Sequence, residues 1–261
     1  MDSFGATVFE IIGKRRKEMK NILGVLGGMG PQATVRFYDL AIEKSRAMGA
    51  CKNCDFPHMV ISNAPVPDFI SGRKDEEVAV GMIEQEIVRL ENAGADFLVI
   101  TCNTMHLHME RFRAKGSVPI LSMIDAVVDK IKADQKKCVG VLGSPTTMNS
   151  KLYSGPLSMA GLKVLVPSQP DQDILEMIIR QVIAGKNLPE FHESIFEIAF
   201  DLVDKGADAI VLGCTELPLV ASEAIQELKE AVWYDSLKIL VSVAIEMVFS
   251  HLRGNNENSP D

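Results

Sequence analysis

Two cysteines lie in closely similar surroundings, and both are candidates for acid–base chemistry. Cys102 lies in the segment TCNT at 101–104, and Cys214 lies in GCTE at 213–216. Each follows a short apolar run typical of a buried strand, so each is expected at the carboxyl end of a strand, where open parallel sheets bind ligands. If the following residues begin a helix, its dipole and free N–H groups would lower the pKa of each thiol.

The neighbours of these cysteines are small and polar. Asn103, Thr104 and Thr215 can donate hydrogen bonds to a carboxylate held at the same edge. If the two segments share a cleft, the thiols would face each other across a ligand, which suits removing a proton from one face of a carbon and adding one to the other. Simple packing is the alternative for either cysteine alone, because free Cys is often buried. The matched surroundings favour the chemical interpretation.

The elements that must position these cysteines follow an alternating pattern. Short β-branched runs alternate with longer segments of helical period, such as 80–90 and 174–182, which is typical of a parallel sheet flanked by helices. Cys138 lies inside one such run without polar residues after it, so it is expected to pack in the core. The predicted strands span 22–27, 58–62, 96–101, 138–143, 163–166 and 208–213.

The two halves of the chain resemble each other. The segment 23–28 matches 139–144, and 92–104 matches 204–216, in the same order and at nearly the same separation of about 115 residues. Two buried strands can be similar by chance, but the shared glycines and the shared cysteine lie outside the usual composition of such strands. This pattern predicts duplication of an α/β unit.

We therefore expect an α/β fold of two similar lobes, each a parallel-sheet α/β/α sandwich, with the active site in the cleft between them. Residues 19–121 plus 233–253 should form the first lobe, and 122–232 the second, with hinge motion controlling access to the cleft. Residues 1–18 are expected to be an N-terminal extension, and 254–261 a disordered tail.

Composition excludes several classes of protein. The chain has 261 residues, of which 47% are hydrophobic and 24% charged, so it is neither a disordered nor a collagen-like protein. Its net charge is −8 and no basic stripe occurs, so nucleic acid is not an expected partner. No apolar run approaches the roughly 18 residues that span a membrane. Five cysteines, an odd number, without a secretion signal predict reduced thiols and a cytoplasmic protein.

Three further motifs are candidate cofactor, metal or catalytic sites, and each indicates such a site less clearly than the two cysteines do. The glycine-rich turn at 24–30 departs from the dinucleotide pattern, and the next predicted strand ends without the expected acidic residue, so a nicotinamide cofactor is disfavoured. We expect this turn to bring backbone close to a small anionic ligand, with Met29 as a wall. Cys51 and Cys54 lack further zinc ligands nearby, so they are interpreted as incidental loop cysteines and no metal is expected. His106 could be a donor behind Cys102, or a capping or packed histidine.

The segments GVLGGMGPQAT at 24–34, ITCNTMH at 100–106 and VLGCTELPLV at 211–220 together resemble the aspartate/glutamate racemase family of cofactor-independent amino-acid racemases. The likeness covers about residues 19–250. It implies that Cys214 takes the α-proton from the L-amino acid and Cys102 from the D-enantiomer, each returning a proton from its own side. It also implies that the enzyme needs no cofactor and is a homodimer.

The resemblance extends to the substrate contacts. Asn103, Thr104 and Thr215 would hold the α-carboxylate and ammonium groups, and Thr147, in the turn GSPTT, matches a family position near the ligand. Glu216 stands where glutamate racemases have His, as in aspartate-type members. The full predicted set of substrate-binding residues is Met29, Asn63, Phe69, Asn103, Thr104, Thr147, Thr215 and Glu216.

Two positions depart from aspartate-using relatives. Phe69 replaces an Arg that grips the distal carboxylate, and Ile183 replaces a Lys on a later helix. A distal carboxylate would then lack its expected charge partners and would be costly to bury, although Arg73 or Lys186 could substitute. The predicted substrate is therefore aspartate or a broader, less acidic range of amino acids.

Two alternatives remain open. A hydantoin racemase, maleate isomerase or arylmalonate decarboxylase could share the scaffold, but retention of both cysteine motifs favours amino-acid racemisation. A non-catalytic binding module for small carboxylates would show a ligand-induced melting shift without exchange of any α-proton. A pyridoxal enzyme is disfavoured because no lysine stands out as a Schiff-base partner.

Overall fold

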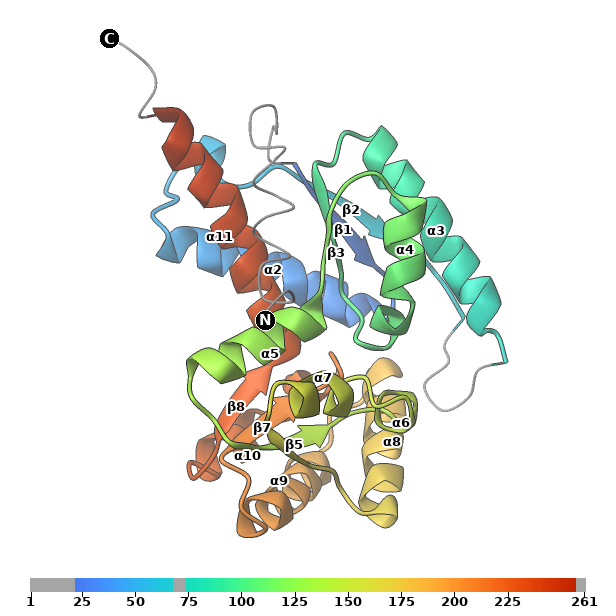
Figure 1. Cartoon of the computed structure of the whole chain (residues 1–261), viewed down its shortest axis with the longest axis vertical. Helices are drawn as coiled ribbons and strands as arrows, with labels where there is room; N and C mark the ends of the chain where they lie inside the picture. Colours follow the sequence, from blue (N-terminus) through green and yellow to red (C-terminus); the bar gives the residue numbers. More distant parts are fainter. Residues whose placement is uncertain (1–21, 68–73, 257–261) are drawn as a thin grey trace.

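Two four-stranded parallel sheets flanked by helices make up the part of the chain that the computed structural model describes, residues 22–67 and 74–256 (Figure 1). The predicted extension at 1–18, together with Phe69 and Arg73, lies outside the described residues.

The first sheet has the strand order β2-β1-β3-β4. Its strands are β1 (Leu23–Gly27), β2 (Met59–Asn63), β3 (Phe97–Ile100) and β4 (Ile120–Leu121). The helical elements of this half are α2 (Pro31–Ala47), η1 (Asn53–Asp55), α3 (Glu76–Asn92), η2 (Thr104–His108) and α4 (Met109–Lys115).

The second sheet repeats the same order as β6-β5-β7-β8. Its strands are β5 (Cys138–Leu142), β6 (Lys163–Leu165), β7 (Ala209–Leu212) and β8 (Val232–Asp235). The helical elements are α5 (Met123–Ala133), α6 (Pro145–Asn149), α7 (Ser154–Met159), α8 (Gln169–Ile183), α9 (Pro189–Asp204), η3 (Leu217–Leu219), α10 (Ser222–Glu227) and α11 (Ser236–Asn256).

Strand pairing confirms the predicted fold of two similar lobes. Leu23 of β1 pairs with Phe97 of β3, and the equivalent Val139 of β5 pairs with Ala209 of β7. A Cβ atom on Gly24 would lie 2.3 Å from Leu98 Cδ2, and one on the equivalent Gly140 would lie 2.7 Å from Ile210 Cδ1. In both repeats, therefore, a strand glycine leaves room for the apolar side chain at the equivalent position of the neighbouring strand.

Successive residues of the buried strands contribute to opposite faces of each sheet. Phe97 and Val99 of β3 pack with α2 and α11, whereas Leu98 and Ile100 pack with α3 and α4. In the second sheet α5 and α7 cover one face and α8 and α9 the other. Because both faces are covered, strands such as β1 and β5 are buried along their whole length.

The six predicted strands are present, with ends that differ from the predicted ones by at most one residue, but the sequence did not predict β4 and β8. Strand β4 has only two residues, and β8 has the partly exposed sequence VWYD without an apolar run. Both lie at a sheet edge, where pairing with β3 or β7 defines them rather than local composition.

Helix α11 follows β8 directly, yet it packs beside α2 on the first sheet (Figure 1). Its buried Leu237 and Leu240 belong to the same core as Phe37 of α2. The helix runs to Asn256, so residues 254–256, predicted to be disordered, are helical, and 257–261 lie outside the described residues.

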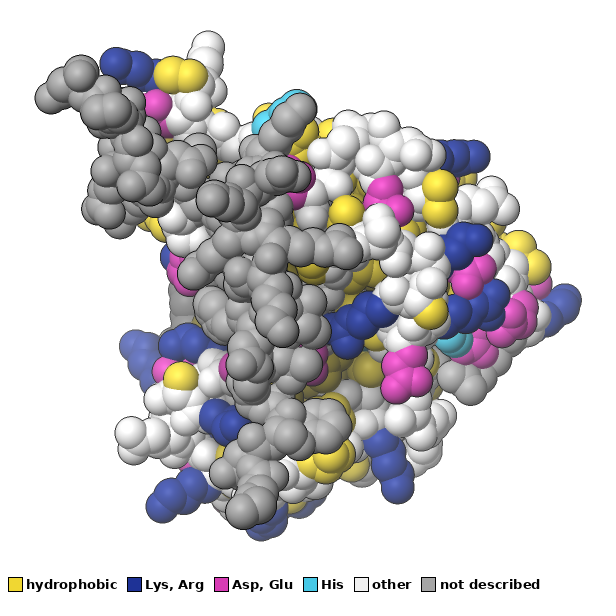
Figure 2. All heavy atoms as spheres, turned by 45° about the horizontal axis from the view of Figure 1, so that its top comes forward, with side chains coloured by type: hydrophobic (Ala, Val, Ile, Leu, Met, Phe, Trp, Pro, Cys, Tyr) yellow, Lys and Arg dark blue, Asp and Glu magenta, His cyan; other side chains and the backbone are white. Residues whose placement is uncertain are grey.

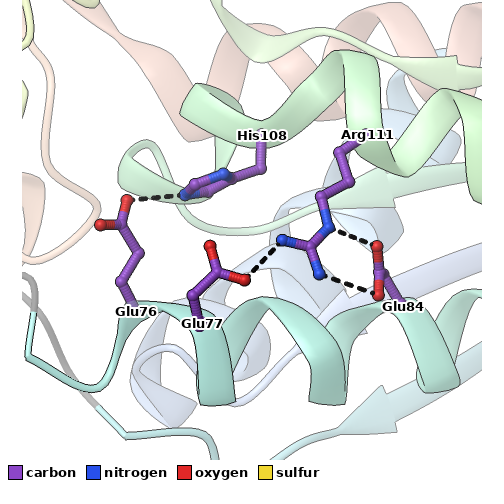
Figure 3. Close-up of polar contacts among 5 residues, drawn as sticks. All are labelled: Glu76, Glu77, Glu84, His108 and Arg111. Atoms are coloured by element: carbon purple, nitrogen blue, oxygen red, sulfur yellow. Dashed lines mark hydrogen bonds and ion pairs between the residues drawn. The ribbon is translucent and has the colours of Figure 1, made fainter.

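The segment that follows Cys102 is tied to α3 by charged groups (Figure 3). Arg111 donates to both carboxylate oxygens of Glu84, at 2.6 and 3.3 Å, and to Glu77 at 2.7 Å. His108 pairs with Glu76 Oε1 at 2.9 Å. These contacts hold η2 and α4 against α3.

Acidic and basic side chains are interspersed over the face of the molecule that Figure 2 presents. Of the helices in the described part of the chain, none combines the length and apolar character needed to cross a membrane.

Candidate active site

A cavity of about 230 Å³ is lined by residues that follow the carboxyl ends of strands in both sheets. The β1–α2 turn and the segment after β3 contribute from the first lobe, and the segments after β5 and β7, with the end of α8, from the second. Ligand sites in open parallel sheets occupy this edge. The predicted site residues in its lining are Met29, Cys102, Asn103, Thr104, Cys214, Thr215 and Glu216.

Two predicted contacts do not line this cavity. Asn63 is exposed at the end of β2. Thr147 is buried in the first turn of α6, where its N–H donates to Ser144 Oγ at 3.3 Å. Ser144, which caps this helix, lines the cavity instead.

A buried carboxylate joins the two lobes beside Cys214. Glu216 is only 4% exposed. Its Oε2 accepts hydrogen bonds from the Cys214 thiol at 3.0 Å and from Thr215 Oγ1 at 3.1 Å. Its Oε1 accepts the Gly30 N–H of the first lobe at 3.3 Å. Glu216 therefore holds one thiol while it connects the glycine-rich turn to the second sheet.

The prediction of lowered thiol pKa values is wrong. Burial raises the pKa of Cys102 to about 11, with the Glu216 charge adding to it, although N–H donors of Met105 and Thr104 oppose the shift. Burial, and then the charge and hydrogen bond of Glu216, raise the pKa of Cys214 well above its ordinary value. The cysteines precede the short helices η2 and η3, whose small dipoles do not offset desolvation. Both thiols are protonated near neutral pH in the ligand-free protein.

The glycine-rich turn approaches the cavity through backbone atoms, as expected. Gly28 has φ of +96°, and a Cβ there would lie 2.3 Å from the Ala64 carbonyl oxygen. Only glycine fits this conformation so close to another backbone segment. Gly28 N–H also donates to Thr34 Oγ1 at 2.9 Å, so α2 holds the turn. Met29 forms part of the wall, and Pro31 begins the helix.

The remaining wall is apolar. Ile183 lines the cavity from the last turn of α8, and Ile179 lies one turn earlier. Val66, Pro67 and Met105 complete it. In the described residues the lining contains no Lys or Arg, and Lys186 is not part of it. Sequence reasoning missed Ile179, although its i, i+4 spacing from Ile183 on one helix could have indicated it.

Asn103 takes part in a buried hydrogen-bond network that the sequence did not reveal. The Tyr153 hydroxyl donates to Asn103 Oδ1 at 2.5 Å, and Asn103 Nδ2 donates to Ser236 Oγ at 3.1 Å. Ser236 Oγ in turn donates to the Leu212 carbonyl at 2.9 Å. The Asn103 side chain is thus bonded within the protein.

His106 lies behind Cys102, outside the cavity lining. Its Nε2 accepts the Met123 N–H at 2.9 Å, so Nδ1 carries the proton and donates it to the Cys102 carbonyl at 2.8 Å. Burial lowers the pKa of His106 to about 4, which keeps the ring neutral. Its role is therefore to hold backbone at the active edge.

The other cysteines lie away from the cavity. Cys51 and Cys54 are exposed, and both thiols donate to the Asp55 carboxylate. Cys138 is buried in β5, which confirms that it packs in the core. Within residues 22–67 and 74–256, no group of three or more His, Cys, Asp or Glu side chains is arranged to hold a metal ion.

Comparisons with known proteins agree with this geometry. Residues 26–244 match the family model described as Asp/Glu/Hydantoin racemase. The chain is 30% identical over 203 residues to the broad specificity amino-acid racemase RacX of Bacillus subtilis, covering 76% of this chain and 87% of the relative. The structure is similar to the Picrophilus torridus aspartate racemase, with TM-score 0.75, 29% identity and coverage of 87% of this chain and 94% of that chain. A Pyrococcus horikoshii aspartate racemase homologue has TM-score 0.73 and 28% identity, covering 88% and 99%.

Proposed function

Because this chain belongs to the Asp/Glu/hydantoin racemase family, we propose that it is a cofactor-independent amino-acid racemase with Cys102 and Cys214 as its two bases. One observation carries the proposal: two thiols from equivalent positions of the duplicated unit line the same cavity. The homodimer and the cytoplasmic location expected from the sequence remain part of the proposal.

The chemistry needs one thiolate and one thiol. The Cys214 thiolate removes the Cα proton of the L-amino acid, and the Cys102 thiol donates its proton to the opposite face of the carbanion, which leaves Cys214 protonated and Cys102 as thiolate. The D-enantiomer reacts by the reverse route. Donors of Thr104 and the backbone N–H of Thr215 would bind the α-carboxylate and stabilise the charge that develops on it, since the Thr215 hydroxyl already donates to Glu216.

Substrate binding would lower the pKa values of the two thiols. Glu216 raises the pKa of both cysteines. An ammonium group bound beside this carboxylate would offset its charge and lower both thiol pKa values, so one thiol can ionise while the other remains protonated. The substrate's own amino group would therefore activate the base, which explains how thiols of high pKa could serve near neutral pH.

The cavity favours a neutral or apolar side chain. Ile179, Ile183 and Val66 surround it, and Glu216 supplies its negative charge. A distal carboxylate would be desolvated there beside another carboxylate without a described cation to pair with it. The breadth named for the Bacillus subtilis relative supports a range of amino-acid substrates, whereas the two structural relatives are named for aspartate.

The test is a chirality assay over twenty amino acids of each hand without added cofactor, with α-proton exchange followed in deuterium oxide. We expect racemisation and exchange for neutral or apolar substrates. Cys102→Ala and Cys214→Ala should each reduce racemisation by at least about 100-fold, the usual contribution of a positioned acid or base. The control is Cys138→Ala, a cysteine buried away from the cavity, which should retain activity if it folds.

Three outcomes would contradict the proposal. Full activity in both cysteine variants would eliminate the two-thiol mechanism. A ligand-induced melting shift without α-proton exchange would favour a binding module. A clear preference for aspartate, or for a hydantoin, would overturn the substrate assignment while leaving the acid–base chemistry intact.

A further inference from the structure

Tyr153 touches the immediate neighbours of both candidate catalytic cysteines. It directly precedes α7 and is 1% exposed. Its hydroxyl donates to Asn103 Oδ1 at 2.5 Å, and Asn103 follows Cys102 in the chain. Its ring lies against Gly213, which precedes Cys214. A Cβ on Gly213 would lie only 3.0 Å from Tyr153 Cε2, so the ring packs on the bare backbone there.

Asn103 is also connected to the second sheet through Ser236. Asn103 Nδ2 donates to Ser236 Oγ at 3.1 Å, and Ser236 Oγ donates to the Leu212 carbonyl at 2.9 Å. Leu212 ends β7, two residues before Cys214. Asn103 is therefore linked to the end of β7 by two routes, through the ring of Tyr153 and through the hydroxyl of Ser236.

The Tyr153 hydroxyl is not placed to act as an acid or base. Tyr153 does not line the cavity, and its hydroxyl is directed to Asn103. Burial raises the pKa of Tyr153 far above its ordinary value, which keeps the hydroxyl protonated as a donor. Any contribution of Tyr153 to the reaction must therefore come from how it positions Asn103 and Gly213.

We propose that Tyr153 is a positioning residue that fixes the separation of Cys102 and Cys214 across the cavity. This inference rests on the proposed two-thiol racemisation. Proton transfer to and from one carbon depends steeply on distance, and a misplacement of about 1 Å can reduce the rate about 100-fold. Without the hydroxyl, Asn103 Oδ1 would be buried unpaired and the Cys102 segment would shift, while the ring would still support Gly213.

The experiment compares Tyr153→Phe with Tyr234→Phe. Tyr234 is also buried in the second lobe, and its hydroxyl donates to Asp134 at 2.9 Å, away from the cavity. Each substitution removes one hydroxyl and keeps the ring. We expect similar modest losses of stability, but a 10- to 100-fold fall in kcat with little change in KM only for Tyr153→Phe. Ser236→Ala should also lower kcat, and it keeps the test available if Tyr153→Phe folds poorly.

Isotope effects provide a readout that general destabilisation would not change. The hydroxyl acts on the Cys102 side, so its loss should make proton transfer at Cys102 the slower step. With α-deuterated substrates, the isotope effect on kcat/KM should rise for the D-enantiomer and fall for the L-enantiomer in Tyr153→Phe. It should remain at the wild-type values in Tyr234→Phe.

The results separate this inference from the function on which it rests. If the wild-type chain exchanges no α-proton, the proposed function fails and the positioning role fails with it. If the wild type racemises but Tyr153→Phe and Tyr234→Phe have equal kcat and unchanged isotope effects, the positioning role alone is overturned.

Discussion

Glu216 places a buried negative charge near both cysteines. Its carboxylate accepts the Cys214 thiol, the Thr215 hydroxyl and the Gly30 N–H. Its charge raises the pKa of Cys214 directly and that of Cys102 across the cavity. A residue noticed in the sequence as a marker of substrate type is, in the structure, the electrostatic centre of the site.

Glu216→Gln should make both thiols more acidic. Burial is the main cause of the raised pKa values and would remain, but the amide removes the Glu216 charge that adds to it, so the pKa of Cys102 should fall below about 11. Thiolate would then form at lower pH, and the rise of kcat/KM with pH should begin earlier. Thiolate absorbance at alkaline pH, compared with the Cys102→Ala and Cys214→Ala variants, measures the shift. Glu223→Gln on the exposed face of α10 is the control, and identical titrations of the two variants would refute the effect.

Helix α8 presents the apolar wall that distinguishes this site. Ser168 caps its start by accepting the Asp171 N–H, and the helix ends at Ile183 beside the cavity. Gln32 Nε2 donates to the Ile183 carbonyl at 3.5 Å, so α2 of the first lobe meets this end of α8. The helix that we propose to select the substrate side chain thus lies at the junction of the lobes.

Ile183→Lys should shift the preference toward acidic substrates. Ile183 is 36% exposed, so a lysine stem can follow the apolar wall while its ammonium reaches the cavity. A charge-assisted hydrogen bond is worth about 1.5–3 kcal/mol, so kcat/KM for aspartate relative to a neutral amino acid should rise about 10-fold or more. Met177→Lys places the same charge on α8 at a residue 43% exposed and outside the cavity, and it should leave the ratio unchanged. An equal ratio in both variants would show that Ile183 does not select the substrate.

Helix α11 couples the two halves of the molecule. It begins at the end of β8 in the second sheet and buries its apolar face against α2 and the first sheet (Figure 1). The ion pair between Arg36 of α2 and Asp235 at the end of β8 reinforces this junction. We expect the lobes to unfold together, because unfolding of either lobe would break the packing of α11 and the ion pair that join the two halves.

Leu240→Ala should destabilise the whole protein rather than one lobe. Leu240 is fully buried between α11 and the first sheet, and truncation of such a leucine costs about 2–5 kcal/mol. Chemical denaturation followed by circular dichroism and by Trp233 fluorescence, which reports the second sheet, should give one coincident transition at lower denaturant. The exposed Lys238→Ala on the same helix is the control. Separate transitions for the two probes would show that the lobes are independent.

Local patterns were sufficient for the duplicated α/β fold and for much of the site. Six strands, the glycine-rich turn and the two cysteines could be predicted because buried strands, tight turns and strand ends have short-range signatures. The family resemblance, rather than a local pattern, indicated Ile183 as an apolar replacement. Local patterns missed β4 and β8, because pairing with β3 and β7 rather than composition makes these edge segments strands.

Contacts between residues far apart in the chain account for what could not be predicted. Glu216 meets Gly30, and Tyr153 meets Asn103, only because the two sheets face each other across the cavity. The thiol pKa values had the opposite sign from the expectation because desolvation depends on everything packed around an atom, whereas the helix-end argument considered neighbours in sequence alone. The sequence was therefore enough to predict that the two cysteines share a cavity, while their protonation and their spacing follow from three-dimensional packing.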